Sequence, residues 1–312
     1  MVQVILYYNY VHIEDVSRFR ADHYKLCSSL KLSGRIYIAE EGINGTLAGA
    51  DKNIQKYKEH LLSLEGFEQT AFKVDTCEEN PFRKLIVRIR PEIAALKATV
   101  KVNPGEAKAK HLSPEEWKKA IESDEDFIMI DVRNDYEYAI GHFTGAIMMT
   151  VNNFFQSEEW LDHCHIPKDK KILMYCTGGI RCEKFSLLMQ AKGYTDVSQL
   201  DGGIIHYAHS IGDDHFQGKC FVFDDRLAVE IEKNQKKPLA ECVITGKPCD
   251  DYINCANPDC NKLFICSAEG ARKMQGCCSN ECLEADRKRP FDPDNIYAPS
   301  KKWYQYFDSK SR

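Results

Sequence analysis

Residues 176–182 read Cys-Thr-Gly-Gly-Ile-Arg-Cys and contain the residue types of a reactive-thiol loop. The apolar run at 172–175 predicts a strand before Cys176, and residues 183–189 have helical spacing. A cysteine placed there faces backbone N–H groups and the positive end of a helix, which both stabilise a thiolate. We therefore predict that Cys176 is a nucleophile and that Arg181 assists it. The other residues of the predicted active-site loop are Thr177, Gly178, Gly179, Ile180 and Cys182.

The length of this loop limits the kinds of group that it can bind. Arg181 follows Cys176 by five positions, whereas a cysteine phosphatase needs a loop one residue longer to wrap a tetrahedral phosphate. The shorter loop suits a terminal sulfur or another small group, and it resembles the active-site loop of the rhodaneses, which are sulfurtransferases. By contrast, an isolated cysteine such as Cys27 or Cys77 is more simply explained as a small buried hydrophobic residue.

The composition limits the class of protein. A chain of 312 residues, of which 43% are hydrophobic, is long enough for about two or three domains with their own cores. No apolar run approaches the length of a membrane span, and the first residues lack the features of a secretion signal. We therefore expect a cytoplasmic protein without a membrane partner. The net charge of −5 argues against general attraction to nucleic acid.

The N-terminal part of the chain predicts a ferredoxin-like α+β sandwich. Hydrophobic periodicity gives a βαββαβ order, with antiparallel strands and two helices on one face. The expected strands are 2–8, 35–39, 45–48, 69–75 and 84–90, and the expected helices are 14–31 and 51–63. A turn is expected at 40–44.

A basic stretch from residue 83 to residue 119 contains ten Lys or Arg against four Glu. Strand alternation at its start separates an apolar face from a charged face. The residues expected on the core side are Leu85, Val87 and Ile89, and those expected on the opposite face are Lys84, Arg88 and Arg90. A sheet face with three cations can follow a phosphate backbone, so we predict that the second set binds RNA. An ordinary solvated linker is the alternative explanation.

The middle of the chain predicts an α/β domain with a parallel sheet. Residues 113–116 form a helix capping box, and buried strands at 127–131 and 171–175 alternate with helical segments. Cys176 follows the second of these strands, at the carboxyl edge where open α/β sheets place their ligands. The expected organisation is a domain at 1–91, a linker at 92–112, an α/β domain at 113–215 and a cysteine-rich region at 216–312.

Several motifs together carry a family resemblance. Those that resemble a rhodanese domain, in order and spacing, are Asp131 to Tyr138, Gly141 to Ala146, the loop at 176–182 and Asp201-Gly202-Gly203. Those that more narrowly resemble the bacterial tRNA uridine hydroxylases are GRIYIAEEGING at 34–45, YCTGGIRCEK at 175–184, Gly202-Gly203-Ile204 and FVFD at 221–224. The resemblance covers essentially the whole chain.

This resemblance implies an oxygen-dependent conversion of the wobble uridine of tRNA to 5-hydroxyuridine. It places the persulfide-forming catalytic cysteine of the family on Cys176. The implied co-substrates are molecular oxygen and an unidentified reductant, and the implied partner is the anticodon stem-loop of tRNA. Two alternatives stay open: a sulfurtransferase acting on a small thiol or on tRNA, and a non-enzymatic RNA-binding adaptor.

The loop suggests one mechanism as a hypothesis. The thiolate or persulfide of Cys176 adds to C6 of the uracil, C5 becomes electron-rich and meets an oxygen species, and a thiol reductant resets the site. Arg181 and the loop N–H groups stabilise the developing negative charge. Cys182 is a candidate resolving thiol, unless its side chain points into the helix.

Other residues of the rhodanese-like motifs have simpler structural explanations. Asp131 and Arg133 are expected to form an ion pair at the end of their strand. Gly202 and Gly203 are expected where a turn approaches the active-site loop closely.

Eight of the 14 cysteines lie between residues 242 and 282. This density indicates either a zinc module or reduced thiols packed in a small irregular fold. The spacing leaves no CxxC pair, and Thr245 and Gly270 occupy the positions that would complete such pairs, so two full zinc sites are not expected. The candidate ligands of a single zinc site are Cys255, Cys260, Cys278 and Cys282. The chain ends in a basic segment that contains Lys301, Lys302, Trp303, Tyr304 and Phe307.

Overall fold

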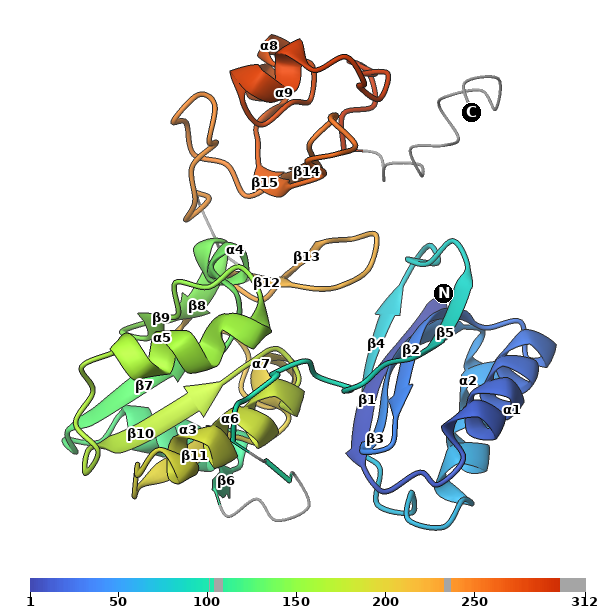
Figure 1. The fold of residues 1–312 in the computed structure, drawn as a ribbon, viewed down its shortest axis with the longest axis vertical. Coiled ribbons are helices and arrows are strands. Elements are labelled where there is room, and N and C mark those ends of the chain that lie inside the picture. The colour runs from blue at the N-terminus through green and yellow to red at the C-terminus, as the bar shows by residue number, and fades with distance from the viewer. Residues whose placement is uncertain (101, 104–108, 233–236, 298–312) are drawn as a thin grey trace. The chain divides into compact units, whose positions relative to one another are not determined.

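The computed structural model describes residues 1–100, 102–103, 109–232 and 237–297 (Figure 1). The chain forms two compact units, of which the first contains Met1–Asp135, Phe143–His215 and Val222–Arg226. The second contains Tyr136–His142, Phe216–Phe221 and Leu227–Arg312. Across the described residues, every helix is too short or too polar to span a bilayer. The basic or aromatic residues of the sequence analysis that lie outside the described residues are Lys101, Lys108, Lys301, Lys302, Trp303, Tyr304 and Phe307.

The N-terminal domain is the expected ferredoxin-like sandwich, and all five expected strands are present, one more than the βαββαβ order contains. Its strands are β1 (Val2–Tyr10), β2 (Ser33–Ala39), β3 (Gly42–Gly49), β4 (Phe72–Cys77) and β5 (Leu85–Ile89). The sheet order is β4-β1-β3-β2-β5, and its first four strands pair antiparallel. β5 differs from the expectation because it pairs parallel with β2 at the sheet edge. The expected turn at 40–44 is also shorter, since β3 begins at Gly42.

Two helices, α1 (Val16–Ser29) and α2 (Asp51–Leu62), bury one face of this sheet. Side chains alternate along each strand, so Ile5 and Tyr7 of β1 enter this core, together with Cys27 of α1 and Tyr57 of α2. The alternate residues of the same strands lie on the helix-free face. Cys27 is therefore the buried small hydrophobic residue that the sequence predicted.

Strand β5 confirms most of the predicted alternation. Val87 is buried in the helix-covered core, and Leu85 packs against that core. The prediction for Ile89 is wrong, because this side chain is 45% exposed. It is the last residue of an edge strand, where burial by neighbouring elements falls off. The predicted cations of the opposite face, which are Lys84, Arg88 and Arg90, are all exposed.

The middle of the chain contains the predicted parallel sheet. Its strands are β6 (Lys110–Leu112), β7 (Phe127–Asp131), β9 (Ile147–Met148), β10 (Lys171–Tyr175) and β11 (Val197–Leu200). The order is β6-β11-β10-β7-β9, and all neighbouring strands are parallel. The helices are α3 (Pro114–Ile121), α5 (Ser157–His163), α6 (Ile180–Ala191) and α7 (Gly203–Ser210), with a short 3-10 helix at Phe154–Gln156 before α5.

Helices cover both faces of this sheet, as Figure 1 shows. Leu161 of α5 and Phe185 of α6 belong to the core on one face. Trp117 of α3 and Tyr207 of α7 pack around Phe143 on the other face. The predicted capping box at the start of α3 is present, with the Ser113 and Glu116 side chains each bonded to the other residue's backbone N–H. The range expected as a linker contains structure, since β6 lies in it and Leu96 is buried.

The second unit is small and cysteine-rich. It contains a sheet in the order β13-β12-β8, formed by β8 (Gly141–Phe143), β12 (Phe216–Phe221) and β13 (Ala228–Glu230). A hairpin follows, formed by β14 (Tyr252–Asn254) and β15 (Leu263–Ile265). Its helices are α4 (Asp135–Ala139), α8 (Ala268–Lys273) and α9 (Asn280–Glu284). Cysteines form much of its core, including Cys242, Cys249, Cys255, Cys266, Cys277 and Cys282.

Candidate active site

Cys176 lies in the loop between β10 and α6, as the sequence predicted. The strand ends at Tyr175, and the helix begins at Ile180 after the N-cap residue Gly179. The Cys176 sulfur accepts a hydrogen bond from the backbone N–H of Gly179 at 3.1 Å. Cys176 itself is only 1% exposed. The sulfur therefore lies over the loop backbone and is shielded from solvent.

The surroundings of Cys176 favour its thiolate form. Burial alone would raise the pKa of this thiol. Hydrogen bonds from the Cys182 thiol and from backbone N–H groups, together with the positive charge of Arg181, outweigh burial and lower the pKa to about 5. Burial and the adjacent thiolate raise the pKa of Cys182, so this residue stays a protonated donor. Cys176 is thus ionised at neutral pH.

Arg181 lies in the first turn of α6 and is mostly buried. Its guanidinium donates a hydrogen bond to the Thr177 hydroxyl at 3.3 Å and lies over the Phe223 ring, 5.9 Å from the centroid. These contacts keep the cation beside the loop. The predicted loop residues, from Cys176 to Cys182, are therefore brought together around one sulfur.

The turn before α7 presses against this loop. A Cβ atom at Gly203 would lie 2.4 Å from the Cys176 carbonyl oxygen, and the backbone N–H of Ile204 donates to that oxygen at 3.0 Å. The predicted close approach is therefore present. The predicted ion pair is present as well, because Arg133 Nη2 lies 2.6 Å from Asp131 Oδ2 and both side chains are fully buried.

The helix-free face of the N-terminal sheet contacts the same loop. Tyr10 donates to the Ile180 carbonyl at 3.2 Å, and Tyr8 donates to Glu183 Oε1 at 3.0 Å. Lys73 of β4 donates to the Gly178 carbonyl at 3.0 Å. Burial raises the pKa values of both tyrosines, with the nearby acidic groups adding to the effect. The N-terminal domain thus places neutral phenol groups and one lysine beside the Cys176 loop.

An acidic network extends from the loop. Glu183 accepts a hydrogen bond from Gln199 at 2.9 Å and lies 3.5 Å from His111. His111 lies 3.6 Å from Asp201 on its other ring nitrogen. Hydrogen bonds to Asp201 and Glu183 raise the pKa of His111 to about 10. The imidazolium thereby neutralises carboxylates that would otherwise repel the thiolate.

The sequence analysis missed the contribution of the N-terminal sheet. The segment Tyr7-Tyr8-Asn9-Tyr10 carries a signal, because strand alternation sends Tyr8 and Tyr10 away from the helix-covered core. Lys73 carries no local signal. Its contact with Gly178 joins residues 105 positions apart, so it depends on how the two sheets pack.

The predicted RNA-binding cations lie on the same helix-free face. Cross-strand pairing puts Arg88 beside Tyr37, Tyr37 beside Asn44, and Asn44 beside Tyr8. Arg90 lies over the Tyr37 ring, 5.3 Å from its centroid. A row of cationic, aromatic and amide side chains therefore runs across the sheet from β5 to β1.

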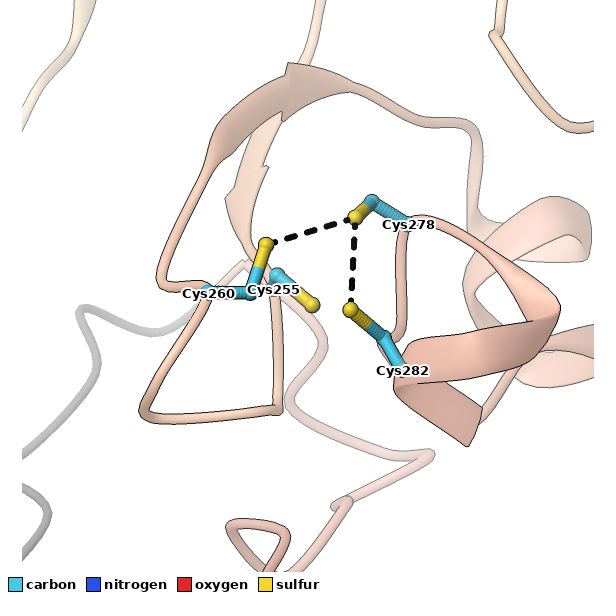
Figure 2. A group of neighbouring side chains, drawn as sticks. All are labelled: Cys255, Cys260, Cys278 and Cys282. Atoms are coloured by element: carbon cyan, nitrogen blue, oxygen red, sulfur yellow. Dashed lines mark hydrogen bonds between the residues drawn. The ribbon is translucent and has the colours of Figure 1, made fainter. Parts of the chain in front are cut away.

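The four predicted zinc ligands come together in the second unit. Figure 2 shows the side chains of Cys255, Cys260, Cys278 and Cys282 pointing toward one another. All four sulfur atoms lie within 4.8 Å of one another. The sulfur of Cys278 is 3.7 Å from that of Cys260 and 3.9 Å from that of Cys282. A disulfide would need a separation of about 2 Å, so these are free thiols.

The spacing of these thiols fits a tetrahedral metal ion. Zinc bound to four thiolates at about 2.3 Å places the sulfur atoms about 3.8 Å apart. Burial raises the pKa of Cys255, and it raises that of Cys278 to about 11. The pKa of Cys282 is lowered, because hydrogen bonds from Ser279 and from neighbouring cysteines outweigh its burial. A metal cation is what allows four adjacent thiols to ionise together.

A second group of cysteines lies around the start of α8. Ser267, the N-cap residue of this helix, donates a hydrogen bond to the Cys242 sulfur at 3.3 Å. A Cβ atom at Gly270 would lie 2.8 Å from the Cys242 sulfur and 3.2 Å from the Cys266 sulfur. Thr245 also hydrogen-bonds to Cys242. Glycine and threonine thus occupy the positions beside the sulfur atoms, as the spacing indicated.

Comparison with known families divides the chain into three matching regions. Residues 2–93 match the UPF0176 acylphosphatase like domain. Residues 113–209 match the rhodanese-like domain, and residues 217–283 match the rhodanase C-terminal domain. The candidate active-site loop at 176–182 therefore lies inside the rhodanese-like region.

Three relatives are similar to this chain over most of its length. A tRNA uridine(34) hydroxylase of Enterococcus faecalis is 45% identical over 297 residues, which cover 94% of this chain and 94% of that protein. One from Staphylococcus aureus is 43% identical over 297 residues, covering 94% and 93% of the two chains. One from Bacillus cereus is 42% identical over 290 residues, covering 92% and 91%.

Proposed function

Since this chain belongs to the tRNA uridine(34) hydroxylase family, we propose that it converts uridine 34 of tRNA to 5-hydroxyuridine, with Cys176 as the nucleophile. The single observation that carries the assignment to Cys176 is its buried sulfur, which accepts a hydrogen bond from the Gly179 N–H between the end of β10 and the start of α6. Because a thiolate adds to electron-poor carbons, the C6 atom of uracil is a suitable target. The proposed co-substrates are molecular oxygen and a thiol reductant.

The proposed reaction replaces the C5–H bond of uracil by a C5–OH bond. The Cys176 sulfur bonds to C6, and the electron pair of the C5=C6 bond moves onto C5 and O4. C5 then takes a hydroxyl group from a peroxide, which forms when a thiol reductant gives two electrons and two protons to O2, and hydroxide leaves. The hydroxide takes the C5 proton and becomes water, the C6–S bond breaks, and Cys176 leaves as a thiolate. Each turnover thus consumes one O2 and two thiols and yields water and a disulfide.

The loop residues support this addition and elimination. The N–H of Gly179 and the Cys182 thiol stabilise the thiolate before addition and after its release. Arg181 provides a positive charge for the enolate oxygen that develops when C5=C6 opens. Cys182 acts here as a hydrogen-bond donor, since its high pKa makes it a poor attacking thiol.

We propose that the base enters from the side that the N-terminal sheet covers. Leu6 and Tyr8 of β1 lie against Gly178 and Gly179, and Cys176 is 1% exposed. The wobble base lies in a single-stranded loop, so turning it out costs less than it would in a duplex. We infer that the base displaces the Tyr8 and Tyr10 contacts and that these rings then stack on it.

The exposed cations of β5 are the proposed contacts to the anticodon stem-loop. Lys84, Arg88 and Arg90 share the helix-free face with Tyr8, so phosphates bound there would hold the stem-loop beside the base-entry side. Phosphate contacts set the position of a nucleic acid, whereas stacking and base-edge contacts select the base. The cytoplasm, which holds the tRNA, is the proposed location.

We further propose that Cys255, Cys260, Cys278 and Cys282 bind one structural zinc ion. The sulfur separations of 3.7 and 3.9 Å match those of a tetrahedral four-thiolate site, and all four sulfur atoms lie within 4.8 Å of one another. Four protein ligands leave no open position, so zinc would fix the β14–β15 hairpin to α9 rather than take part in the reaction.

Complementation of a strain that lacks the endogenous enzyme tests the proposed activity. Wild type and C77S, a control in a half-buried cysteine of β4, should restore 5-hydroxyuridine in total tRNA, measured by nucleoside mass spectrometry. C176S should not. Loss of thiolated nucleosides instead would establish sulfur transfer, and unchanged nucleosides in every strain would favour a non-enzymatic RNA-binding role.

A further inference from the structure

One peptide group connects the N-terminal sheet to the candidate nucleophile. Lys73 Nζ donates a hydrogen bond to the carbonyl oxygen of Gly178 at 3.0 Å. The N–H of Gly179, which belongs to the same planar peptide as that carbonyl, donates to the Cys176 sulfur at 3.1 Å. An unbroken chain of bonds therefore runs from an ammonium group in β4 through one peptide to the thiolate.

We propose that Lys73 is a positioning residue for Cys176 and acts through the peptide between Gly178 and Gly179. A charged donor on the carbonyl polarises the peptide and strengthens the hydrogen bond that its N–H donates. It also fixes the rotation of this peptide, because the group is planar and both ends are held. Lys73 thereby keeps the N–H aimed at the sulfur.

The surroundings of Lys73 hold it in this role. Its ammonium group lies over the Tyr8 ring, 4.9 Å from the centroid, which restricts the side chain on the sheet. Leu6 closes the other side of the peptide, since a Cβ atom at Gly178 would lie 2.8 Å from Leu6 Cδ2. The carbonyl of Gly178 is thus held between β1 and β4.

Other charged or titratable groups also face the two ends of this chain of bonds. Burial lowers the pKa of Lys73, whereas the negative charges of Asp201, Cys176 and Glu183 favour its ammonium form. Asp201 and Glu183 also bind His111. Arg181 and Cys182 act directly on the Cys176 sulfur. The negative charges of Glu183 and Cys176 add to burial in raising the pKa values of Tyr8 and Tyr10. A variant at Lys73 leaves all of these groups in place, so its effect reports on the lysine.

The inference gives the N-terminal domain a role in the chemistry as well as in substrate binding. Because Lys73 belongs to β4, the peptide is held only while that strand contacts the loop. The hydrogen bond from the Gly179 N–H to the Cys176 sulfur is then strongest only when the N-terminal sheet contacts the loop. This functional meaning rests on the proposed reaction of Cys176, whereas the coupling itself can be measured without tRNA.

Alkylation of Cys176 by iodoacetamide across a pH series tests the coupling in the full-length protein. The rate is followed on the Cys176 peptide by mass spectrometry. K73M should raise the midpoint of the profile by roughly one pH unit, which slows alkylation about tenfold below the midpoint. K73R keeps a charged donor and should keep the wild-type midpoint. The matched control is K58M, because Lys58 lies over the Phe72 ring in the same domain, away from the loop.

A K73M midpoint equal to that of wild type and K58M would overturn the inference, and so would a K73R shift as large as that of K73M. If K73M does not fold, K73Q replaces it in the same comparison. Hydroxylation by C176S separates this result from the proposed function. An active C176S enzyme with a shifted K73M profile would refute the proposed function alone, and an inactive C176S enzyme with an unshifted K73M profile would refute the coupling alone.

Discussion

Replacing Gly203 by alanine should displace the loop that contains Cys176. The backbone at Gly203 has a φ of +67°, and an added Cβ atom would lie 2.4 Å from the Cys176 carbonyl oxygen. The same atom would lie 2.7 Å from the Thr177 carbonyl oxygen and 2.8 Å from the Gly178 nitrogen. Ordinary contact begins at 3.4 Å, so the loop has to move by about 1 Å. All three neighbours are backbone atoms, which cannot rotate out of the way.

The G203A variant combines two effects, the strain of alanine at positive φ and the displacement of the Cys176 loop. A substitution at a second glycine, Gly145, measures the strain alone. Alanine at positive φ costs about 1–2 kcal/mol of stability wherever it occurs. Gly145 has a φ of +82° and no atom of the described chain within 4 Å of the added Cβ, so G145A carries that cost alone. G203A adds the displacement of Cys176. A misplacement of about 1 Å at reacting groups can lower a rate on the order of 100-fold.

Urea denaturation measures the loss of stability, and the rate of tRNA hydroxylation measures the effect of displacing the Cys176 loop. G145A should lower the free energy of unfolding by about 1–2 kcal/mol and keep its hydroxylation rate. G203A should lose more stability than G145A, and its rate should fall on the order of 100-fold under conditions where the protein is folded. If G203A matched G145A in both measurements, the close approach of this turn to the Cys176 loop would be refuted.

Three further predictions follow from the site and the cysteine cluster. Because the pKa of Cys176 is lowered to about 5, its alkylation rate should rise with pH around a midpoint near 5 and stay level above pH 6. A midpoint above 8 would contradict the thiolate assignment. Purified wild-type protein should contain about one zinc per chain by elemental analysis. The variant C282S should lose this zinc and the control C77S should keep it. Zinc retained by C282S would refute the four-cysteine site. R88A should weaken tRNA binding and reduce the slope of log affinity against log salt by about 0.7–0.9, and an unchanged slope would remove Arg88 from the interface.

Local patterns in the sequence predicted the strand–loop–helix structure around Cys176 correctly, because these three segments follow one another in the chain. The apolar run before Cys176 becomes β10, and the helical spacing after it becomes α6. The capping box at Ser113 is present for the same reason, since its hydrogen bonds join residues close in the chain. The candidate zinc site consists of two pairs of cysteines, Cys255 with Cys260 and Cys278 with Cys282, and the members of each pair are close in sequence.

Features that depend on packing between distant segments could not be predicted in the same way. Lys73 and Tyr8 reach the loop only because the helix-free face of one sheet contacts the end of another. The strand alternation that predicted a buried Ile89 holds for Val87 but fails at the end of an edge strand. The linker prediction likewise missed β6, whose three residues become a strand by pairing with β11.

The reaction of purified enzyme with unmodified tRNA under ¹⁸O₂ tests the central claim most directly. Wild-type protein with a thiol reductant should form 5-hydroxyuridine at position 34 that carries one ¹⁸O atom, and C176S should form none. Label that comes from H₂¹⁸O instead of ¹⁸O₂, or 5-hydroxyuridine formed by C176S at the wild-type rate, would contradict the account.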